Sequence, residues 1–335
     1  MKRKRFKFIG ILVLLLSFIL SACSGGGSSA TSGDGEEAKS DFPKKPIKLF
    51  VTFAPGGSSD IVARALAEAT NKYLPNGQTV VVENKPGGAG TVGVTEVLSA
   101  KADGYTVGLT AMSPLAIQPH YGKTTYQLDD VGMLMQITSQ PLVLAVKNDA
   151  PWKTYEEWLQ YVKENPGKFR YGVQGSGGIS QIVMEAVNKQ EGTKTEHIPY
   201  DGSAPAMTAL LGGHVEGAVV QDMEAKTYVD SGDVRILFSS EASMLYKDIT
   251  TLKDAGIDFE MGTWSGLIMP KDVPEDIRDI LHESFKKGLE DSQTEKILSE
   301  QGLSIQYAGP EEFKTMTEDD SDVLGKIMKD TGLIK

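Results

Sequence analysis

The chain has 335 residues, of which 40% are hydrophobic and 24% charged, so it can form one large globular domain or two ordinary ones. Its formal net charge is −11, and this acidic balance disfavours nucleic-acid binding. The net negative charge does not exclude an anionic ligand, because local backbone dipoles can outweigh a diffuse, salt-screened surface charge. The single cysteine, Cys23, excludes a disulfide framework and a cysteine metal site.

The N-terminus has the pattern of a bacterial lipoprotein signal. A basic segment, 1–7, precedes an apolar segment, 8–20, that is too short to span a membrane comfortably. Leu20-Ser21-Ala22-Cys23 then resembles the site where such signals are cleaved and the cysteine is lipidated. We expect a signal peptide at 1–22, a lipid anchor on Cys23 at the outer face of the cytoplasmic membrane, and a flexible Ser/Gly-rich tether at 23–40. A retained anchor helix and a plain secretory signal are the alternatives.

From residue 41 onward, strand and helix patterns alternate. An apolar run at 47–53 predicts a strand, and a helical pattern follows residue 60. Further strands are expected at 79–83, 105–110, 131–138, 141–146, 169–173, 197–200, 215–221 and 264–269. Helices are expected at 92–100, 154–164, 181–190 and 205–211, and through most of the chain after 274. This alternation predicts parallel sheets covered by helices.

Two Gly/Ser-rich segments, 53–60 and 175–180, each join a predicted strand to a predicted helix. Their glycines let the backbone come close to a ligand. The free N–H groups of a first helical turn, with the positive end of the helix dipole behind them, favour an anion. One such joint would be an ordinary capped turn, but two predict an anion site. Neither segment holds a basic residue, so we expect backbone and hydroxyl donors to bind the anion.

Residues 88–93 fit G-x-G-x-x-G between a strand and a helix, which is the pattern of a dinucleotide site. The strand at 105–110, however, is not followed by an acidic residue that could bind a ribose. The four histidines lack the spacing of metal ligands, and no nucleophile motif is present. We therefore expect no catalytic residue, metal or cofactor, and keep a nucleotide-dependent α/β enzyme only as an alternative.

Six segments in chain order resemble the solute-binding proteins of tripartite tricarboxylate transporters, the TctC or Bug family. They lie at 45–49, 55–64, 81–88, 102–106, 199–206 and 210–213; residues 55–60 read P-G-G-S-S-D and 199–205 read P-Y-D-G-S-A-P. The resemblance covers 43–333 and implies a two-lobed α/β Venus-flytrap fold with the ligand in a cleft. Lobe 1 would comprise 41–141 and 264–335, and lobe 2 would comprise 142–263. The crossovers at 140–142 and 262–264 would form the hinge.

The resemblance also implies which residues hold the ligand, with a carboxylate gripped through N–H groups, hydroxyls and ordered waters. The implied residues are Gly56, Gly57, Ser58, Ser59 and Ser113 in lobe 1, and Gly175, Ser176, Gly177, Ser180, Tyr200, Ser203, Ala204 and Gln221 in lobe 2. Asp60 belongs to the same site, but we expect it to hold its loop, since two carboxylates in contact repel each other. The chain has Gln181 and Asp201 where many relatives have His and Lys, so the resemblance does not extend to the far end of the ligand.

The function implied is extracytoplasmic capture of a small organic carboxylate, such as a di- or tricarboxylate. The protein would act as a monomer and deliver the ligand to the large and small membrane subunits of a transporter. A lipoprotein that senses the same ligand for a membrane signalling receptor is an alternative, because both functions need the same closing cleft.

Overall fold

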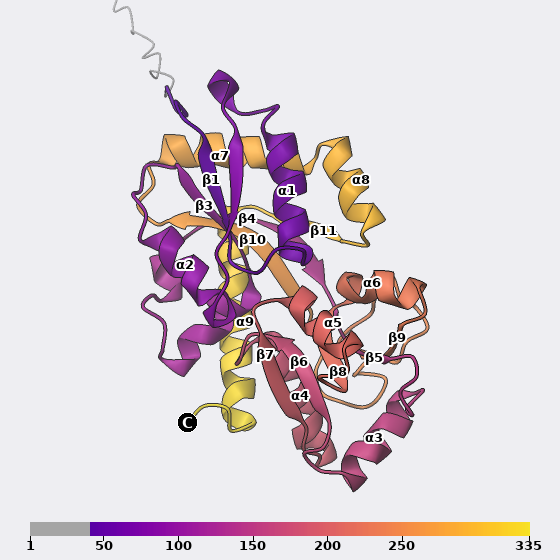
Figure 1. Ribbon diagram of the computed structural model, residues 1–335. Coiled ribbons are helices and arrows are strands. Elements are labelled where there is room, and N and C mark those ends of the chain that lie inside the picture. Colours follow the sequence, from indigo (N-terminus) through magenta and orange to yellow (C-terminus); the bar gives the residue numbers. More distant parts are fainter. Residues whose placement is uncertain (1–40) are drawn as a thin grey trace, which may run out of the picture. The chain divides into compact units, whose positions relative to one another are not determined.

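The computed structural model describes residues 41–335. The predicted signal peptide, Cys23 and the tether lie outside these described residues. The described part contains one six-stranded and one five-stranded sheet, with helices packed against both (Figure 1). This is the two-lobed α/β fold that the sequence predicts. No helix within 41–335 is long and apolar enough to cross a membrane.

The sheet of lobe 1 has the order β11-β4-β10-β3-β1-β2. Its strands are β1 (Ile47–Val51), β2 (Val80–Asn84), β3 (Thr106–Ala111), β4 (Val131–Gln140), β10 (Thr263–Pro270) and β11 (Ile305–Ala308). Strands β1, β2 and β3 are parallel, whereas β10 runs antiparallel to both β3 and β4. The expectation of parallel sheets is therefore wrong for the strands next to the crossovers, because the chain returns from lobe 2 in the opposite direction.

Helices cover both faces of this sheet. They are α1 (Ser58–Thr70), α2 (Thr91–Leu98), α7 (Glu275–Leu289), α8 (Ser292–Glu300) and α9 (Pro310–Asp330). Short helical turns are η1 (Pro75–Gly77), η2 (Gly88–Gly90), η3 (Ser113–Ile117), η4 (Gln118–Tyr121) and η5 (Leu128–Asp130). Leu49 packs with α1 and α7, while its neighbour Phe50 packs in the cluster that holds α2 and α9. Successive strand residues thus point to opposite faces that are both covered, which explains why apolar residues occupy both faces of β1.

The sheet of lobe 2 has the order β7-β6-β8-β5-β9. Its strands are β5 (Leu142–Lys147), β6 (Arg170–Gln174), β7 (Glu196–Tyr200), β8 (Gly217–Gln221) and β9 (Val234–Ser239). Its helices are α3 (Tyr155–Glu164), α4 (Ile179–Glu191), α5 (Ser203–Leu211) and α6 (Asp222–Asp230). Strand β6 is parallel to β7 and β8, and β5 is antiparallel to β8 and β9. The parallel strands present the starts of α4, α5 and α6 at one edge of the sheet.

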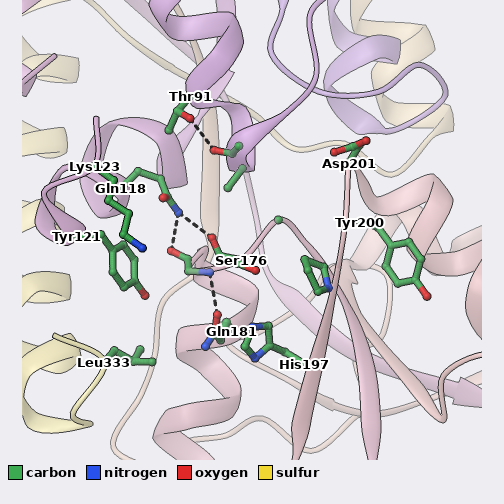
Figure 2. A pocket seen from close by; sticks show the side chains of 15 residues that line it. Thr91, Gln118, Tyr121, Lys123, Ser176, Gln181, His197, Tyr200, Asp201 and Leu333 are labelled. Atoms are coloured by element: carbon green, nitrogen blue, oxygen red, sulfur yellow. Dashed lines mark hydrogen bonds between the residues drawn. The ribbon is translucent and has the colours of Figure 1, made fainter. Parts of the chain in front are cut away.

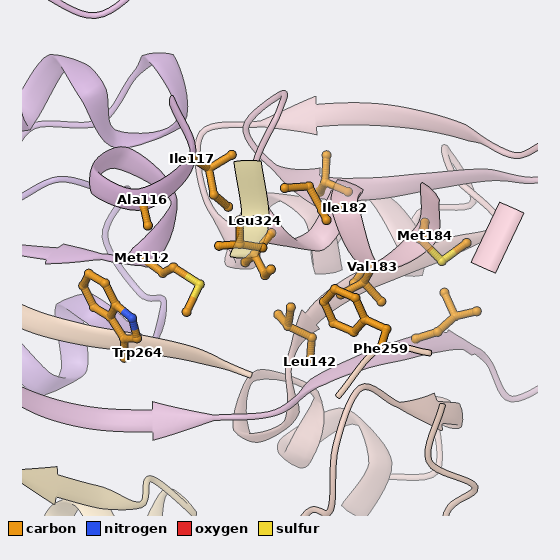
Figure 3. Close-up of a cluster of buried hydrophobic side chains, with 14 of the residues drawn as sticks. Met112, Ala116, Ile117, Leu142, Ile182, Val183, Met184, Phe259, Trp264 and Leu324 are labelled. Carbon is orange, nitrogen blue, oxygen red and sulfur yellow. The ribbon is translucent and has the colours of Figure 1, made fainter. Parts of the chain in front are cut away.

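The two sheets meet where β4 passes into β5 and where β10 begins. Gln140 ends β4, Leu142 begins β5, and Thr263 pairs with Gln140 in the register of β10 and β4. A buried apolar cluster continues across this junction, with Ile117 from lobe 1, Ile182 from α4 and Leu324 from α9 (Figure 3). Helix α9 contacts both β4 and α4, so the C-terminal helix spans the two lobes.

Candidate functional site

Asp60 stabilises the conformation of the loop between β1 and α1. One carboxylate oxygen of Asp60 accepts a hydrogen bond from the Gly56 N–H at 3.1 Å, and the other accepts one from the Asn84 amide at 3.0 Å. Arg64 donates to both oxygens. Burial opposes ionisation, but the bonds from Arg64, Gly56 and Asn84 outweigh it and lower the pKa of Asp60. Asp60 is therefore engaged in holding the loop, and its charge is balanced by Arg64.

The start of α1 contacts a carboxylate that comes from lobe 2. Glu224, in the first turn of α6, accepts hydrogen bonds from the Ser58 backbone N–H at 3.1 Å and from the Ser58 hydroxyl at 2.8 Å. Its other oxygen accepts the Gln221 N–H at 3.1 Å. Burial raises the pKa of Glu224, while bonds from Ser203, Ser58 and Gln221 oppose that rise. The first helical turn of α1 thus donates to a carboxyl group from the other lobe, which is the kind of acceptor that its exposed N–H groups favour.

Other contacts close the lobes around this carboxylate. The Ala54 N–H donates to the Asp201 carbonyl at 3.2 Å, which links the loop after β1 to the loop before α5. A side chain at Gly56 would lie 4.0 Å from the Cβ of Ala204. The pocket between these loops has no room for a water molecule; it is lined by Phe53, Ala54, Gly57, Ser58, Ser59, Gln174, Gly202, Ser203 and Glu224. The structure therefore shows the cleft shut at the start of α1.

The second Gly/Ser segment lies against a different part of lobe 1. The Ile179 N–H, at the start of α4, donates to the Ser113 hydroxyl at 3.0 Å. The Gln118 amide donates to the carbonyls of Ser176 and Gly177 at 3.0 and 2.9 Å. A Cβ at Gly175 would lie 2.4 Å from that of Ala89. The start of α4 therefore faces η2, η3 and η4, while the start of α1 faces α5 and α6.

A groove of about 630 Å³ separates the lobes beside the second segment (Figure 2). Thr91, Gln118, Tyr121 and Lys123 line it from lobe 1, and Ser176, Gln181, His197, Tyr200 and Asp201 line it from lobe 2. The hydroxyl of Tyr121 is buried there without a hydrogen-bond partner in the described part of the chain. The volume is in the range of small-molecule sites, and Ala89 and Gly175, which approach each other closely from the two lobes, are among the residues that line the groove.

The structure places the predicted site residues in two groups. The first group surrounds the Glu224 carboxylate and contains Gly56, Gly57, Ser58, Ser59, Ser203, Ala204 and Gln221. The second contains Ser113, Gly175, Ser176, Gly177, Ser180 and Tyr200, around the start of α4 and the groove. That the two Gly/Ser segments grip one carboxylate between them stays a prediction.

Sequence reasoning missed Glu224, Gln118 and Gln174. Glu224 follows Gln221 by three residues, which is the spacing of a capping box and could have revealed the start of α6. Its contact with Ser58 joins residues 166 positions apart, for which the sequence carries no local signal.

The family assignment rests on a match of residues 62–333 to the family model described as the tripartite tricarboxylate transporter family receptor. The chain belongs to this family. A relative from Cupriavidus necator, named the UPF0065 protein in gbd 5'region, is 33% identical over 304 residues, which cover 89% of this chain and 91% of that protein. Protein BugT of Bordetella pertussis is 29% identical, over 90% of this chain and 94% of BugT.

Solved structures agree with the assignment. The periplasmic binding protein BugD is 30% identical with a TM-score of 0.79, over 88% of this chain and 100% of BugD. A TctC solute-binding protein from Polaromonas, without ligand, is 33% identical with a TM-score of 0.64, over 86% of this chain and 99% of that one. MatC from Rhodopseudomonas palustris, with bound malate, is 26% identical with a TM-score of 0.78, over 85% of this chain and 99% of MatC. The predicted resemblance and the two-lobed fold are thereby confirmed.

Family and fold are those of extracytoplasmic solute-binding receptors, not of enzymes. The G-x-G-x-x-G segment has a structural role instead. A Cβ at Gly93 would lie 2.8 Å from the Lys85 carbonyl and 2.9 Å from the Thr52 Cα, so this glycine lets α2 pack closely on the strand layer. Among residues 41–335, no group of His, Cys, Asp or Glu side chains is arranged to hold a metal ion.

Proposed function

We propose that this receptor captures a small organic carboxylate, of the di- or tricarboxylate kind, outside the cytoplasm and delivers it to a tripartite tricarboxylate transporter. The observation that carries the proposal is the set of hydrogen bonds that the Glu224 carboxylate accepts. The Ser58 N–H and hydroxyl at the start of α1 donate to one oxygen of its carboxylate, and the Gln221 N–H at the start of α6 donates to the other, where the two lobes meet. A ligand carboxylate would find the same donors at the same place.

The family supports the ligand class. The MatC structure, 26% identical to this chain, contains malate, a dicarboxylate. The residues proposed to bind the ligand are Gly56, Gly57, Ser58, Ser59 and Ser203 around the α1 donors, with Ser113, Ser176 and Ser180 at the start of α4. Charge-assisted hydrogen bonds to a carboxylate contribute about 1.5–3 kcal/mol each, so a few of them suffice for tight binding.

Ligand capture would proceed by closure of the lobes about the crossovers near Gln140–Leu142 and before Thr263. The structural comparisons support this motion. The ligand-free Polaromonas protein has the higher sequence identity, 33%, but a TM-score of only 0.64, whereas malate-bound MatC at 26% reaches 0.78. A rotation between lobes of unchanged fold would produce this pattern. A ligand that contacts both lobes only in the closed state shifts the equilibrium towards it.

Cys23 would carry the lipid that holds the folded part on the outer face of the membrane, after removal of residues 1–22. The monomeric receptor would then hand its ligand to the large and small membrane subunits. The tether, 23–40, would give it the reach to do so.

A thermal-shift screen of mono-, di- and tricarboxylates, followed by calorimetric titration of the best acid, tests this function. The acid should bind, and its neutral amide should not, because the helix dipole and N–H donors favour negative charge. Equal affinity for the acid and the amide would contradict the proposal.

A further inference from the structure

Glu224 differs from the other polar residues of the cleft in what it offers the ligand. Ser58, Ser203 and the Gln221 N–H are donors that a carboxylate ligand needs, whereas Glu224 is itself a carboxylate and uses them. It extends from α6 in lobe 2 to α1 in lobe 1, so it also bridges the cleft. The residue most central to the anion site is thus itself an acid, with the same functional group as the expected ligand.

The geometry leaves no room for a second carboxylate while Glu224 is seated. Both oxygens of Glu224 are hydrogen-bonded, at 2.8–3.1 Å, and the pocket beside it has no room for a water molecule. Two carboxyl groups in contact are also disfavoured in this buried setting, because at most one of them could carry a charge there. A ligand carboxylate can reach the Ser58 N–H only if the Glu224 side chain leaves.

The structure offers a place for the displaced side chain. A cavity of about 160 Å³ adjoins Glu224, and Ala204, Met207, Tyr228 and Gln301 are among the residues that line it. Glu224 borders both this cavity and the shut pocket. Rotation about its side-chain bonds can therefore release the α1 donors without unfolding α6.

We infer that Glu224 is a specificity-determining residue: an internal carboxylate that occupies the ligand's anion site in the empty receptor and must be displaced by the ligand. The inference rests on the proposed function, because it takes the ligand to be a carboxylate. Displacement exchanges one carboxylate for another at the same donors, so this exchange alone supplies little affinity. A receptor that seats Glu224 nine times in ten binds every competing carboxylate about tenfold more weakly. Only acids with further groups that contact both lobes then bind, and small monocarboxylates are rejected.

Acetate provides a test that does not require the natural ligand. Glu224→Ala removes the internal carboxylate and leaves its donors free, so acetate should bind and raise the Tm of this variant. Wild type should need about tenfold more acetate for the same rise, because Glu224 fills its site most of the time. Asp230→Ala is the matched control, since it removes an exposed carboxylate from the same helix. Sodium acetate and sodium chloride are compared at equal ionic strength. An acetate response of Glu224→Ala no larger than that of Asp230→Ala would overturn the inference.

Titration with malate, succinate and citrate separates this inference from the proposed function. An acid that binds wild type should bind Glu224→Ala about tenfold or more tightly; equal or weaker binding would show that Glu224 is not a competitor. Glu224→Gln, which keeps the side-chain volume but loses the charge, is titrated as well, so that a fold defect in the alanine variant cannot decide the outcome. If none of these three acids binds wild type or Glu224→Ala, the proposed di- or tricarboxylate ligand is contradicted, while the acetate result still reports on the role of Glu224.

Discussion

Replacement of Gly175 by alanine should hold the receptor open. Gly175 has φ +75°, and an added Cβ would lie 2.4 Å from the Cβ and 2.5 Å from the Cα of Ala89 across the cleft. One of these neighbours is backbone, so the clash cannot be relieved by a side-chain rotation. The clash exists only when the lobes are together, so the substitution destabilises the closed state specifically.

Gly192→Ala is the control for the cost of placing alanine in a backbone conformation with positive φ. Gly192 has φ +66° at the other end of α4, and an added Cβ would meet nothing within 4 Å. Alanine costs about 1–2 kcal/mol in this left-handed conformation at either position. Gly175→Ala adds an overpacking cost of about 1–3 kcal/mol to closure alone. Because the ligand binds the closed state, its affinity should fall by about 5- to 150-fold beyond any effect of Gly192→Ala.

Calorimetric titration of both variants with the best carboxylate measures the difference. In small-angle scattering, saturating ligand should reduce the radius of gyration of Gly192→Ala relative to its ligand-free form. The same comparison for Gly175→Ala should show a smaller reduction. If Gly175→Ala binds as tightly as Gly192→Ala, the contact between Gly175 and Ala89 is not part of the ligand-bound state, and this reasoning is refuted.

Three further predictions follow from single residues. Cys23→Ala should release the protein from the membrane or block its maturation, and mass spectrometry that finds an unmodified Cys23 in membrane-bound protein would contradict a lipid anchor. Ser113→Ala removes the acceptor of the buried Ile179 N–H and should weaken ligand binding about fivefold, from a cost of about 1 kcal/mol to closure; unchanged calorimetric affinity would argue against it. Burial raises the pKa of Asp222 from 3.8 to about 6, so the folded chain binds a proton at this group more tightly than the unfolded chain. The stability that this group contributes is therefore present below about pH 4 and is lost as the pH rises through 6. Asp222→Asn should therefore gain up to about 3 kcal/mol relative to wild type between pH 4 and 7 in denaturant titrations, and parallel pH curves would count against the assignment.

The sequence predicted the strands and helices that an apolar run or a helix-capping residue marks within a short segment. The strand expected at 47–53 is β1 (Ile47–Val51), and Thr154 caps α3 by accepting the Glu157 N–H at 3.3 Å. Strand β11 was not expected, because it is a short edge strand whose Ile305 and Tyr307 are exposed and give no apolar run. The segment after β3, for which no helix was expected, forms η3, since its packing against α9 comes from distant parts of the chain.

The sequence could predict the site only where a single loop supplies the hydrogen-bond donors. The glycines and serines of 53–60 predicted an anion site, and the start of α1 does hold a carboxylate. Its occupant was not predictable, because Glu224 reaches Ser58 only through the packing of one lobe on the other. For the same reason, the sequence could not show that α1 faces α5 and α6 while α4 faces Ser113.

A crystal structure of the receptor with its best carboxylate tests the central claim most directly. The ligand carboxylate should lie about 3 Å from the Ser58 N–H, with the Glu224 side chain moved out of its present position. A ligand bound elsewhere, for example in the groove beside Tyr121 and His197 with Glu224 still on Ser58, would contradict the account.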